Sequence, residues 1–322
     1  MELFIEKVFT SEVLFDTAKR FQVVPEEKPL GDFENFVFKA RRSNGEIRIL
    51  RFTHSSHRSI EEIEQEMSFL DYLGENGAPV AKPHRSINQE FVEPYQTENG
   101  VFYASLFDYA PGTRVTAEDP EFWNDELFKE WGKTIGQLHK LTKNYPHTPH
   151  RLDWEKDEEM YIDYLPNHTL KALAYEIVDS IKKLPKTNDT YGLIHSDVHL
   201  GNFHVQNGNI TIFDFDDLMY QYFIHDLAIV LYYSLLGSNM EEEEKTLFAR
   251  HQLSCLREGY ESQHILDECW YEHLHLFLRL RDISLCGVIY KKFEGKDMPD
   301  NYAQIIESIE ERLRNRQPIV KL

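Results

Sequence analysis

Two short segments of the sequence decide its fold: HSDVHLGN at residues 195–202 and FDFDD at residues 213–217. Asp197 and Asn202 lie five residues apart on a predicted loop, so both side chains can point at one spot. Asp214 follows at the end of the next predicted hairpin and can meet them there. Carboxamide and carboxylate oxygens suit Mg²⁺, which takes few protein ligands and keeps waters or phosphate oxygens. Asp197 is then left to orient a hydroxyl group and take its proton, as phosphoryl transfer requires.

The same segments allow other interpretations. Asp and Asn also cap turns, so each residue alone could be a local cap, but their joint spacing favours a site. His195, Asp197, His199 and His204, joined by His225 and Asp226, could instead bind a transition metal, which would make the protein a metal-dependent phosphohydrolase. Strand alternation turns His204 and its neighbours to opposite faces, which disfavours this cluster. We interpret His195 as a hydrogen-bonding residue that holds the loop, not as a proton carrier.

The composition indicates a folded, acidic protein. Of its 322 residues, 41% are hydrophobic, which is enough to bury a large core. A net charge of −20, from 35 Lys and Arg against 55 Asp and Glu, argues against nucleic acid and against a membrane surface as partners. Cys255, Cys269 and Cys286 form no C-x-x-C pair, so neither disulfides nor a zinc knuckle is indicated. Without a signal-peptide pattern or the ~20 apolar residues of a bilayer span, we expect a soluble, cytoplasmic protein.

The periodicity of the sequence predicts an α+β protein with a small mixed part followed by a mainly helical part. The turn at 43–45 and the turn at 207–209 both have the Asn-Gly pair of tight hairpins. The predicted elements are, in order, a helix capped by Ser11, strands at 36–40 and 47–53, a helix from 60 to about 74–77, a strand at 101–108, helices at 122–141 and 170–184, strands at 193–195, 203–205 and 210–215, and helices from 225 onwards.

The pattern H-x-D-x-x-x-x-N, followed by a hydrophobic-Asp-Phe-Asp-Asp strand end, resembles the aminoglycoside phosphotransferase and choline kinase family, which has a protein-kinase-like fold. LFDYAPG at 106–112 resembles the hinge of that family, GQLH at 136–139 its helix before the catalytic half, and DLA at 226–228 a structural motif. The resemblance covers most of the chain. It implies a two-lobed α+β fold, with a small antiparallel-sheet, nucleotide-binding lobe at 1–108 and a helical lobe at 109–322 that carries the catalytic loop and substrate site. It also implies a kinase that uses ATP, or alternatively GTP, with Mg²⁺.

The resemblance assigns roles residue by residue. Asp197 would be the catalytic base, and Asn202 and Asp214 would hold Mg²⁺. Arg51 stands where the family usually has Lys, and would contact the nucleotide phosphates with Glu66 as its ion-pair partner. Arg binds phosphate through a fork and Lys through a point charge. Taken from the residues alone, the pair could also be a surface salt bridge of little energetic worth.

Three further residues would contact the nucleotide according to the resemblance. Gly31 and Asn35 belong to the phosphate-covering loop at 31–36, which has one glycine and two acidic residues. Asp108 begins the hinge, whose backbone would hydrogen-bond the adenine. The glycine-poor loop and Arg51 motivate a non-catalytic alternative, a degenerate kinase that binds nucleotide or a partner without turnover.

Several other charged residues could have either structural or functional roles. Asp226 is predicted to tie down the catalytic loop from a helix start. Asp216 and Asp217 either assist the metal or cap the chain locally. Arg279 and Arg281, on a late helix, could line the same cleft or pair structurally.

One acidic segment gives an indication of the phosphate acceptor. Residues 153–163 hold six carboxylates with aromatic residues between them, so they form either a solvated helix face or a substrate wall that attracts ammonium groups. The overall acidity favours a small hydroxyl-bearing, amine-carrying acceptor. The oligomeric state is open.

Overall fold

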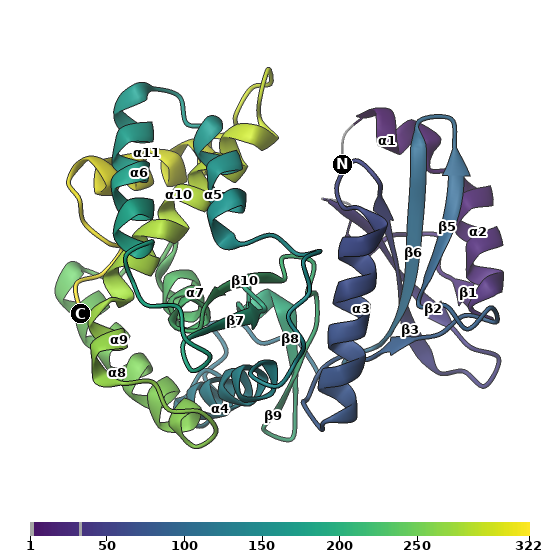
Figure 1. Cartoon of the computed structure of the whole chain (residues 1–322), viewed down its shortest axis with the longest axis horizontal. Helices are drawn as coiled ribbons and strands as arrows, with labels where there is room; N and C mark the ends of the chain where they lie inside the picture. Colours follow the sequence, from purple (N-terminus) through teal and green to yellow (C-terminus); the bar gives the residue numbers. More distant parts are fainter. Residues whose placement is uncertain (1–2, 32–33) are drawn as a thin grey trace. The chain divides into compact units, whose positions relative to one another are not determined.

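The structure is a computed structural model that describes residues 3–31 and 34–322. The chain divides into two compact units (Figure 1). The first unit contains Met1–Gly112 together with Thr211–Asp216, and the second contains Thr113–Ile210 and Asp217–Leu322. The segment that carries Asp214 therefore belongs with the amino-terminal part of the chain. Among the described residues, no helix combines the length and the apolar character needed to cross a membrane.

An antiparallel sheet forms the centre of the first unit, with strand order β1-β2-β3-β6-β4 and β5 also paired to β6. The predicted strands at 36–40, 47–53 and 101–108 are confirmed as β2, β3 and β6, whereas β1, β4 and β5 have no counterpart in the predicted set. The elements of this unit are α1 (Leu3–Val8), α2 (Ser11–Arg20), β1 (Val24–Pro25), β2 (Asn35–Arg41), β3 (Ile47–His54), α3 (Ile60–Glu75), β4 (Pro83–His84), β5 (Val92–Thr97) and β6 (Gly100–Asp108).

The two faces of this sheet carry different side chains because successive residues of a strand alternate between them. Phe38, Leu50 and Phe52 belong to a buried cluster that includes the apolar face of α2. Arg51, between the last two, lies on the opposite face and meets Glu66 of α3. Figure 1 shows α2 and α3 on the two sides of the sheet. The alternation therefore directs one basic side chain out of the apolar cluster and onto α3.

Side-chain caps fix where the helices of the first unit begin. At α3, the Ser59 hydroxyl accepts from the Glu62 backbone N–H at 3.2 Å, and the Glu62 carboxylate accepts from the Ser59 N–H at 2.8 Å. This reciprocal pair is a capping box. At α2, the predicted cap Ser11 is wrong, because the Thr10 side chain accepts from the backbone of Val13 and Ser11 is already helical.

The second unit is mainly helical, as predicted (Figure 1). Two short strand pairs, β7 with β10 and β8 with β9, interrupt the helices. The elements are α4 (Asp125–Thr142), α5 (Trp154–Asp163), α6 (His168–Ile181), β7 (Tyr191–Ile194), a 3₁₀ turn (Leu200–Asn202), β8 (Phe203–Gln206), β9 (Asn209–Ile212, of which the last two residues belong to the first unit), β10 (Met219–Tyr222), α7 (Ile224–Leu235), α8 (Glu242–Glu261), α9 (Glu268–Glu272), α10 (Leu274–Lys292) and α11 (Asp300–Arg314).

Two predicted boundaries need correction. The strand predicted at 210–215 ends at Ile212, and Asp214 adopts φ +65°, a left-handed conformation that interrupts the regular extended backbone of a strand. The helix predicted from 122 begins at Asp125, because the Asn124 side chain accepts from the Leu127 backbone N–H at 3.0 Å and caps the helix there.

Helices α4 and α8 approach each other at two glycines. A Cβ atom on Gly132 would lie 1.9 Å from the carbonyl oxygen of Leu256, and one on Gly259 would lie 1.8 Å from that of Lys129. Such distances are far below van der Waals contact, so only glycine fits at either position. The close crossing fixes α4 against α8.

Candidate active site

In the first unit, Arg51 and Glu66 form a buried, two-pronged ion pair. Arg51 Nη1 donates to Glu66 Oε1 at 2.9 Å, and Nη2 donates to Oε2 at 2.6 Å. Arg51 is 5% exposed and Glu66 is fully buried, so the surface salt bridge considered from the sequence is wrong. Burial would lower the pKa of Arg51, but Glu66, Asp216 and Asp214 outweigh it, so the pKa is raised and the guanidinium stays charged.

Asp214 lies beside this pair. Its Oδ1 is 3.8 Å from Arg51 Nη1, and its side chain is half exposed. The next residue, Phe215, is buried and packs edge-on against Phe69 of α3. The aromatic contact anchors the segment, and the left-handed backbone at Asp214 turns its carboxylate away from the strand direction. Predicted residues Arg51, Glu66 and Asp214 are thus brought together within one unit.

Asp216, the next acidic residue, is held by two cations. His57 Nε2 lies 2.7 Å from Asp216 Oδ2, and Arg58 lies 3.7 Å from the same atom. Burial would raise the pKa of Asp216, but Arg58 and His57 hold it well below its usual range. The carboxylate therefore ties the segment after Asp214 to the residues that follow β3.

The other predicted nucleotide-binding residues lie elsewhere in the first unit. Gly31 makes an isolated antiparallel bridge with Val37, and the Asn35 side chain accepts from the Thr53 hydroxyl at 2.6 Å. Residues 32–33 of the predicted phosphate-covering loop lie outside the described residues. At the hinge, the Asp108 side chain pairs with His84 at 2.7 Å, and its backbone N–H donates to the carbonyl of Lys82 at 2.9 Å.

In the second unit, a chain of polar contacts through α7, α4 and α8 holds the loop after β7. The Ser196 backbone, which has φ +69°, donates to Asp226 Oδ1 at 2.8 Å. Asp226 Oδ2 lies 2.9 Å from His139 Nε2, and His139 Nδ1 lies 2.8 Å from the Tyr260 hydroxyl. Burial would raise the pKa of Asp226, but the contact with His139 outweighs it and lowers the pKa. The predicted anchoring role of Asp226 is confirmed, and the chain of contacts joins α7, α4 and α8 to the loop.

Within that loop, Asp197 and Asn202 come together as predicted. Asn202 Nδ2 donates to the Asp197 carbonyl at 2.9 Å and to its carboxylate Oδ2 at 3.2 Å. His199 Nε2 lies 3.2 Å from the same Oδ2. His195 is buried and its Nδ1 accepts from the Asp197 backbone N–H at 3.2 Å, which confirms that it holds the loop. The amide nitrogen of Asn202 is turned to Asp197, and its oxygen is the atom left for another ligand.

The transition-metal cluster considered from the sequence does not form. Among the described residues, three or more ligand atoms converge within 4.8 Å of one another in two groups, Asp125–His251–Cys255 and Glu34–His57–Asp216. Neither group includes a histidine of the loop at 195–202. The arrangement that would support a metal-dependent phosphohydrolase is therefore missing there.

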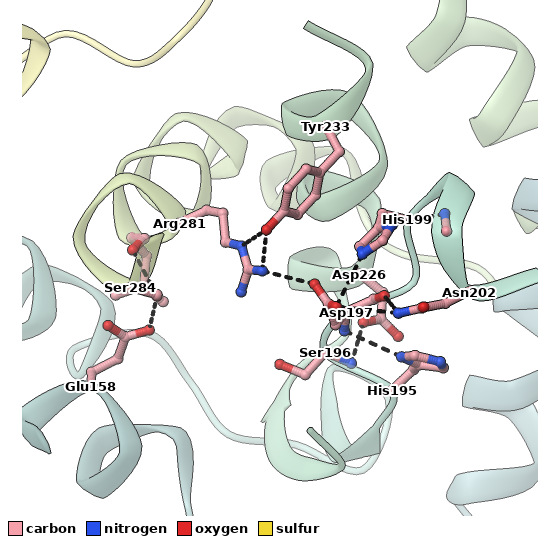
Figure 2. A network of polar contacts seen from close by, with 12 residues as sticks. Glu158, His195, Ser196, Asp197, His199, Asn202, Asp226, Tyr233, Arg281 and Ser284 are labelled. Atoms are coloured by element: carbon pink, nitrogen blue, oxygen red, sulfur yellow. Dashed lines mark hydrogen bonds and ion pairs between the residues drawn. The ribbon is translucent and has the colours of Figure 1, made fainter. Parts of the chain in front are cut away.

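Arg281 of α10 is the cation at Asp197. Figure 2 shows it reaching from α10 towards Tyr233 of α7 and the Asp197 carboxylate. Arg281 Nη2 donates to Asp197 Oδ1 at 2.7 Å. Burial would raise the pKa of Asp197, but Arg281 and then His199 outweigh it, so the pKa lies below its usual value. The sequence left Arg281 open between lining the cleft and pairing structurally, because no local signal ties it to a loop 84 positions earlier.

The acidic segment at 153–163 is not simply a solvated helix face. It forms α5, in which Asp157 and Glu158 are buried. Glu158 Oε1 accepts from the Ser284 hydroxyl of α10 at 2.5 Å, whereas its Oε2 has no hydrogen-bond partner among the described residues (Figure 2). Burial, with a smaller contribution from Asp157, raises the pKa of Glu158 to about 8. The unit thus contains a buried acid that holds a proton near neutral pH.

Comparisons with known proteins identify the family. The family model described as "Phosphotransferase enzyme family" matches residues 27–261. The chain belongs to this family. It is 32% identical over 324 residues to the amicoumacin kinase of Bacillus subtilis (strain 168), a match that covers 98% of this chain and 95% of the relative. The resemblance identified from the catalytic-loop motif is therefore confirmed.

Solved structures confirm the kinase-like α+β fold of this phosphotransferase. The structure titled amicoumacin kinase hAmiN in complex with AMP-PNP, Ca²⁺ and Ami has a TM-score of 0.91 and 29% identity, and covers 100% of this chain and 98% of that one. A microcompartment-associated aminopropanol kinase has a TM-score of 0.72 at 18% identity, with 95% and 98% covered. The choline kinase LicA from Streptococcus pneumoniae has a TM-score of 0.64 at 14% identity, with 97% and 99% covered. The last two matches support the fold alone. The family model and the match to amicoumacin kinase show, in addition, that the protein is a kinase whose acceptor is a hydroxyl group, as predicted.

Proposed function

We propose that this phosphotransferase transfers the γ-phosphoryl group of ATP to a hydroxyl group of a small, amine-bearing molecule, with Mg²⁺ as the metal. The observation that carries the proposal is the Asp197 carboxylate, held by Arg281, Asn202 and His199 on a loop of kinase spacing. The relative hAmiN was solved with AMP-PNP, Ca²⁺ and Ami, which supports ATP as donor, a divalent cation and amicoumacin as the first acceptor to test. GTP is the alternative donor.

Asp197 would act as the base. Its lowered pKa keeps the carboxylate ionised at neutral pH, so it accepts a hydrogen bond from the acceptor hydroxyl and orients the oxygen towards the γ-phosphorus. The new oxygen–phosphorus bond forms as the bond to the departing nucleoside diphosphate breaks, and the hydroxyl proton passes to Asp197. Most of the rate would come from positioning and charge neutralisation, because phosphoryl transfer needs little covalent help.

Asn202 and Asp214 have the chemistry of a Mg²⁺ site. The Asn202 amide nitrogen is bound to Asp197, which leaves a neutral oxygen as its ligand atom. Asp214 offers a half-exposed carboxylate. This oxygen-only set fits a hard cation that keeps waters and phosphate oxygens as its remaining ligands. When bound, the metal would neutralise charge on the β- and γ-phosphates.

Arg51 would contact the nucleotide phosphates, and Glu66 would hold it in place. The two-pronged pair with Glu66 uses the forked edge of the guanidinium and fixes its plane, so Arg51 would offer the phosphates its remaining N–H groups in a fixed position, where a Lys would present a mobile point charge. Gly31 and Asn35 would cover the phosphates, and the backbone of Asp108 would contact the base. Because the Asp108 N–H is already bonded to Lys82, its carbonyl is the group available for that contact.

The acceptor is proposed to carry an amine because of charge. The net charge of −20 attracts cations, and Glu158 places a buried acid on α5 whose Oε2 has no hydrogen-bond partner among the described residues. An ammonium group beside Glu158 would supply that partner and favour loss of the carboxyl proton. The cation would thus replace the proton that burial makes Glu158 retain.

The first experiment is an acceptor screen with a metal-site variant beside the wild type. Release of ADP from Mg-ATP is measured with amicoumacin, aminopropanol, choline or kanamycin, and each product is checked by mass spectrometry for one added phosphoryl group. Asp214→Ala should lose turnover and Mg²⁺-assisted nucleotide binding in calorimetry. Asp189→Asn, at an exposed aspartate paired with Lys143, is the control and should keep both.

Three outcomes would change the proposal. An active Asp214→Ala enzyme would refute the metal assignment. Nucleotide binding without phosphorylation of any acceptor would favour a degenerate kinase. Phosphorylation of neutral alcohols as readily as of their amine counterparts would refute the amine as the recognised group.

A further inference from the structure

The two carboxylate oxygens of Asp197 are held from opposite sides. Oδ2 accepts from Asn202 Nδ2 and lies 3.2 Å from His199, both on the same loop. Oδ1 accepts from Arg281 Nη2 at 2.7 Å, from a helix far along the chain. Figure 2 shows Arg281 on one side of the carboxylate, with His199 and Asn202 on the other. The plane of the carboxylate therefore depends on Arg281 as well as on the loop.

Arg281 is itself fixed by Tyr233. The Tyr233 hydroxyl accepts from Arg281 Nε at 3.2 Å and also from Nη2, so the same nitrogen that reaches Asp197 is held by the phenol. The Tyr233 ring also lies near the guanidinium, 5.0 Å from its carbon, and packs on His199 at 4.7 Å between ring centroids. One tyrosine thus touches the groups that hold both oxygens of the base.

The pair is largely removed from water, which makes its geometry matter. Arg281 and Asp197 have side chains that are 17% and 16% exposed. A charge-assisted hydrogen bond is short and directional, and a guanidinium held through two nitrogens has little freedom to follow a moving carboxylate. The charge of Arg281 also lowers the pKa of Glu158, against the effect of burial. Arg281 thus lies between the base and the buried acid proposed for the acceptor amine (Figure 2).

We propose that Arg281 is a positioning residue for phosphoryl transfer: it fixes the Asp197 carboxylate so that the free lone pairs face the acceptor hydroxyl, and Tyr233 fixes Arg281. The inference rests on the proposed role of Asp197 as the base. It adds a residue pair from α7 and α10 to the contacts that the loop at 195–202 makes with the base. We therefore expect that turnover depends on Arg281 of α10, whereas binding of the nucleotide and of the acceptor does not.

The kinetic test compares four variants by ADP release from Mg-ATP, with and without amicoumacin. Arg281→Met keeps the length and the apolar stem without the charge, and should lower kcat about 10- to 100-fold while the acceptor KM and the nucleotide Kd stay within about threefold. Arg281→Lys should recover part of kcat, because an ammonium can pair with Asp197 but cannot also fork to Tyr233. Tyr233→Phe should give an intermediate loss.

The matched control is Arg279→Met, on the same helix two positions away. Arg279 is acted on by Arg316, Glu176 and Asp282, none of them a residue of the proposed site. It should keep kcat within about twofold of wild type. If the charges of α10 had a purely structural role, Arg281→Met and Arg279→Met would both lower expression and Tm to a similar extent. The kcat per folded molecule would then be unchanged in both variants.

A thermal cycle tests the contact without any reaction. Tm is measured for wild type, Arg281→Met, Asp197→Asn and the double variant. If the ion pair is formed, Arg281→Met lowers Tm in the wild type, where it strands a carboxylate, and lowers it much less in the Asp197→Asn background. Additive changes in Tm would overturn the contact and the proposal with it.

The outcomes separate this inference from the proposed function. If wild type and Arg279→Met phosphorylate amicoumacin and Arg281→Met does so with unchanged kcat, the positioning role is refuted and the function stands. If wild type does not phosphorylate amicoumacin, that acceptor is refuted, and the comparison is made on ATP hydrolysis by water. Equal hydrolysis by wild type and Arg281→Met would then overturn the inference.

Discussion

Replacing Glu158 with Gln should remove the contribution of this residue to the pH dependence of stability. Glu158 has a pKa of about 8 in the folded protein, against 4.5 for an ordinary glutamate. A carboxyl whose pKa is raised on folding binds more protons in the folded than in the unfolded state between these values. The free energy of unfolding therefore falls as pH rises from about 4.5 to about 8.

The size of the effect follows from the shift. At pH 7 the protein is about 2.5 pH units above the unfolded-state pKa of Glu158. Each unit lowers the free energy of unfolding by 1.36 kcal/mol, so the loss is about 3 kcal/mol, an upper bound for one acid with a partner. Gln has the shape of the protonated acid, and its oxygen can still accept from Ser284. Any cost of placing its amide group is the same at every pH.

Urea unfolding at pH 5, 6, 7 and 8 measures the prediction. The unfolding free energy of Glu158→Gln, relative to wild type, should rise by about 2–3 kcal/mol between pH 5 and pH 7. The control is Glu159→Gln, at the exposed neighbouring residue, which pairs loosely with Lys182 at 3.8 Å and should run parallel to wild type. Parallel curves for Glu158→Gln as well would refute the reasoning, because they would mean that Glu158 is ionised in the folded protein at neutral pH.

Three further changes test other parts of the structure. Asp214→Asn should weaken Mg²⁺-dependent ATP binding at least tenfold in calorimetry, because the site loses a formal charge, and should leave Tm almost unchanged since the side chain is half exposed. Arg51→Met should strand the buried Glu66 carboxylate and lower the free energy of unfolding by about 3 kcal/mol, whereas a loss below about 1 kcal/mol in urea unfolding would mean that the pair is not buried in solution. Gly132→Ala should cost more than about 3 kcal/mol by the same measurement, because its Cβ would collide with the carbonyl of Leu256, and a stable variant would show that the helices can separate there without loss.

Local sequence patterns predict the parts of this protein that are built locally. The β2–β3 hairpin follows from its turn residues, and the approach of Asn202 to Asp197 follows from a five-residue spacing on one loop. Arg51 and Glu66 are 15 residues apart, on a strand and the helix after it, and their pairing follows from the family pattern. In each case a short stretch of chain limits where the two groups can be.

Contacts that depend on helix packing could not be predicted in this way. Arg281 meets Asp197 because α10 packs near the catalytic loop, and nothing in the local sequence of either residue encodes that. Glu158 occurs in an acidic stretch that is typical of a solvated face, and it is buried because α10 covers α5. The end of β9 is missed for a different reason, since the left-handed turn at Asp214 breaks a run of strand-forming residues that otherwise continues to 215.

The membership of Thr211–Asp216 in the first unit has a consequence for the modularity of the protein. Ile212 accepts from the N–H of Ala81 and donates to the carbonyl of Pro79, so a late segment completes hydrogen bonds begun in the amino-terminal part. A fragment cut after Gly112 would lose these partners together with Asp214. The first unit therefore cannot be exchanged between relatives as one contiguous segment, and a functional chimera would need to bring residues 211–216 from the same parent.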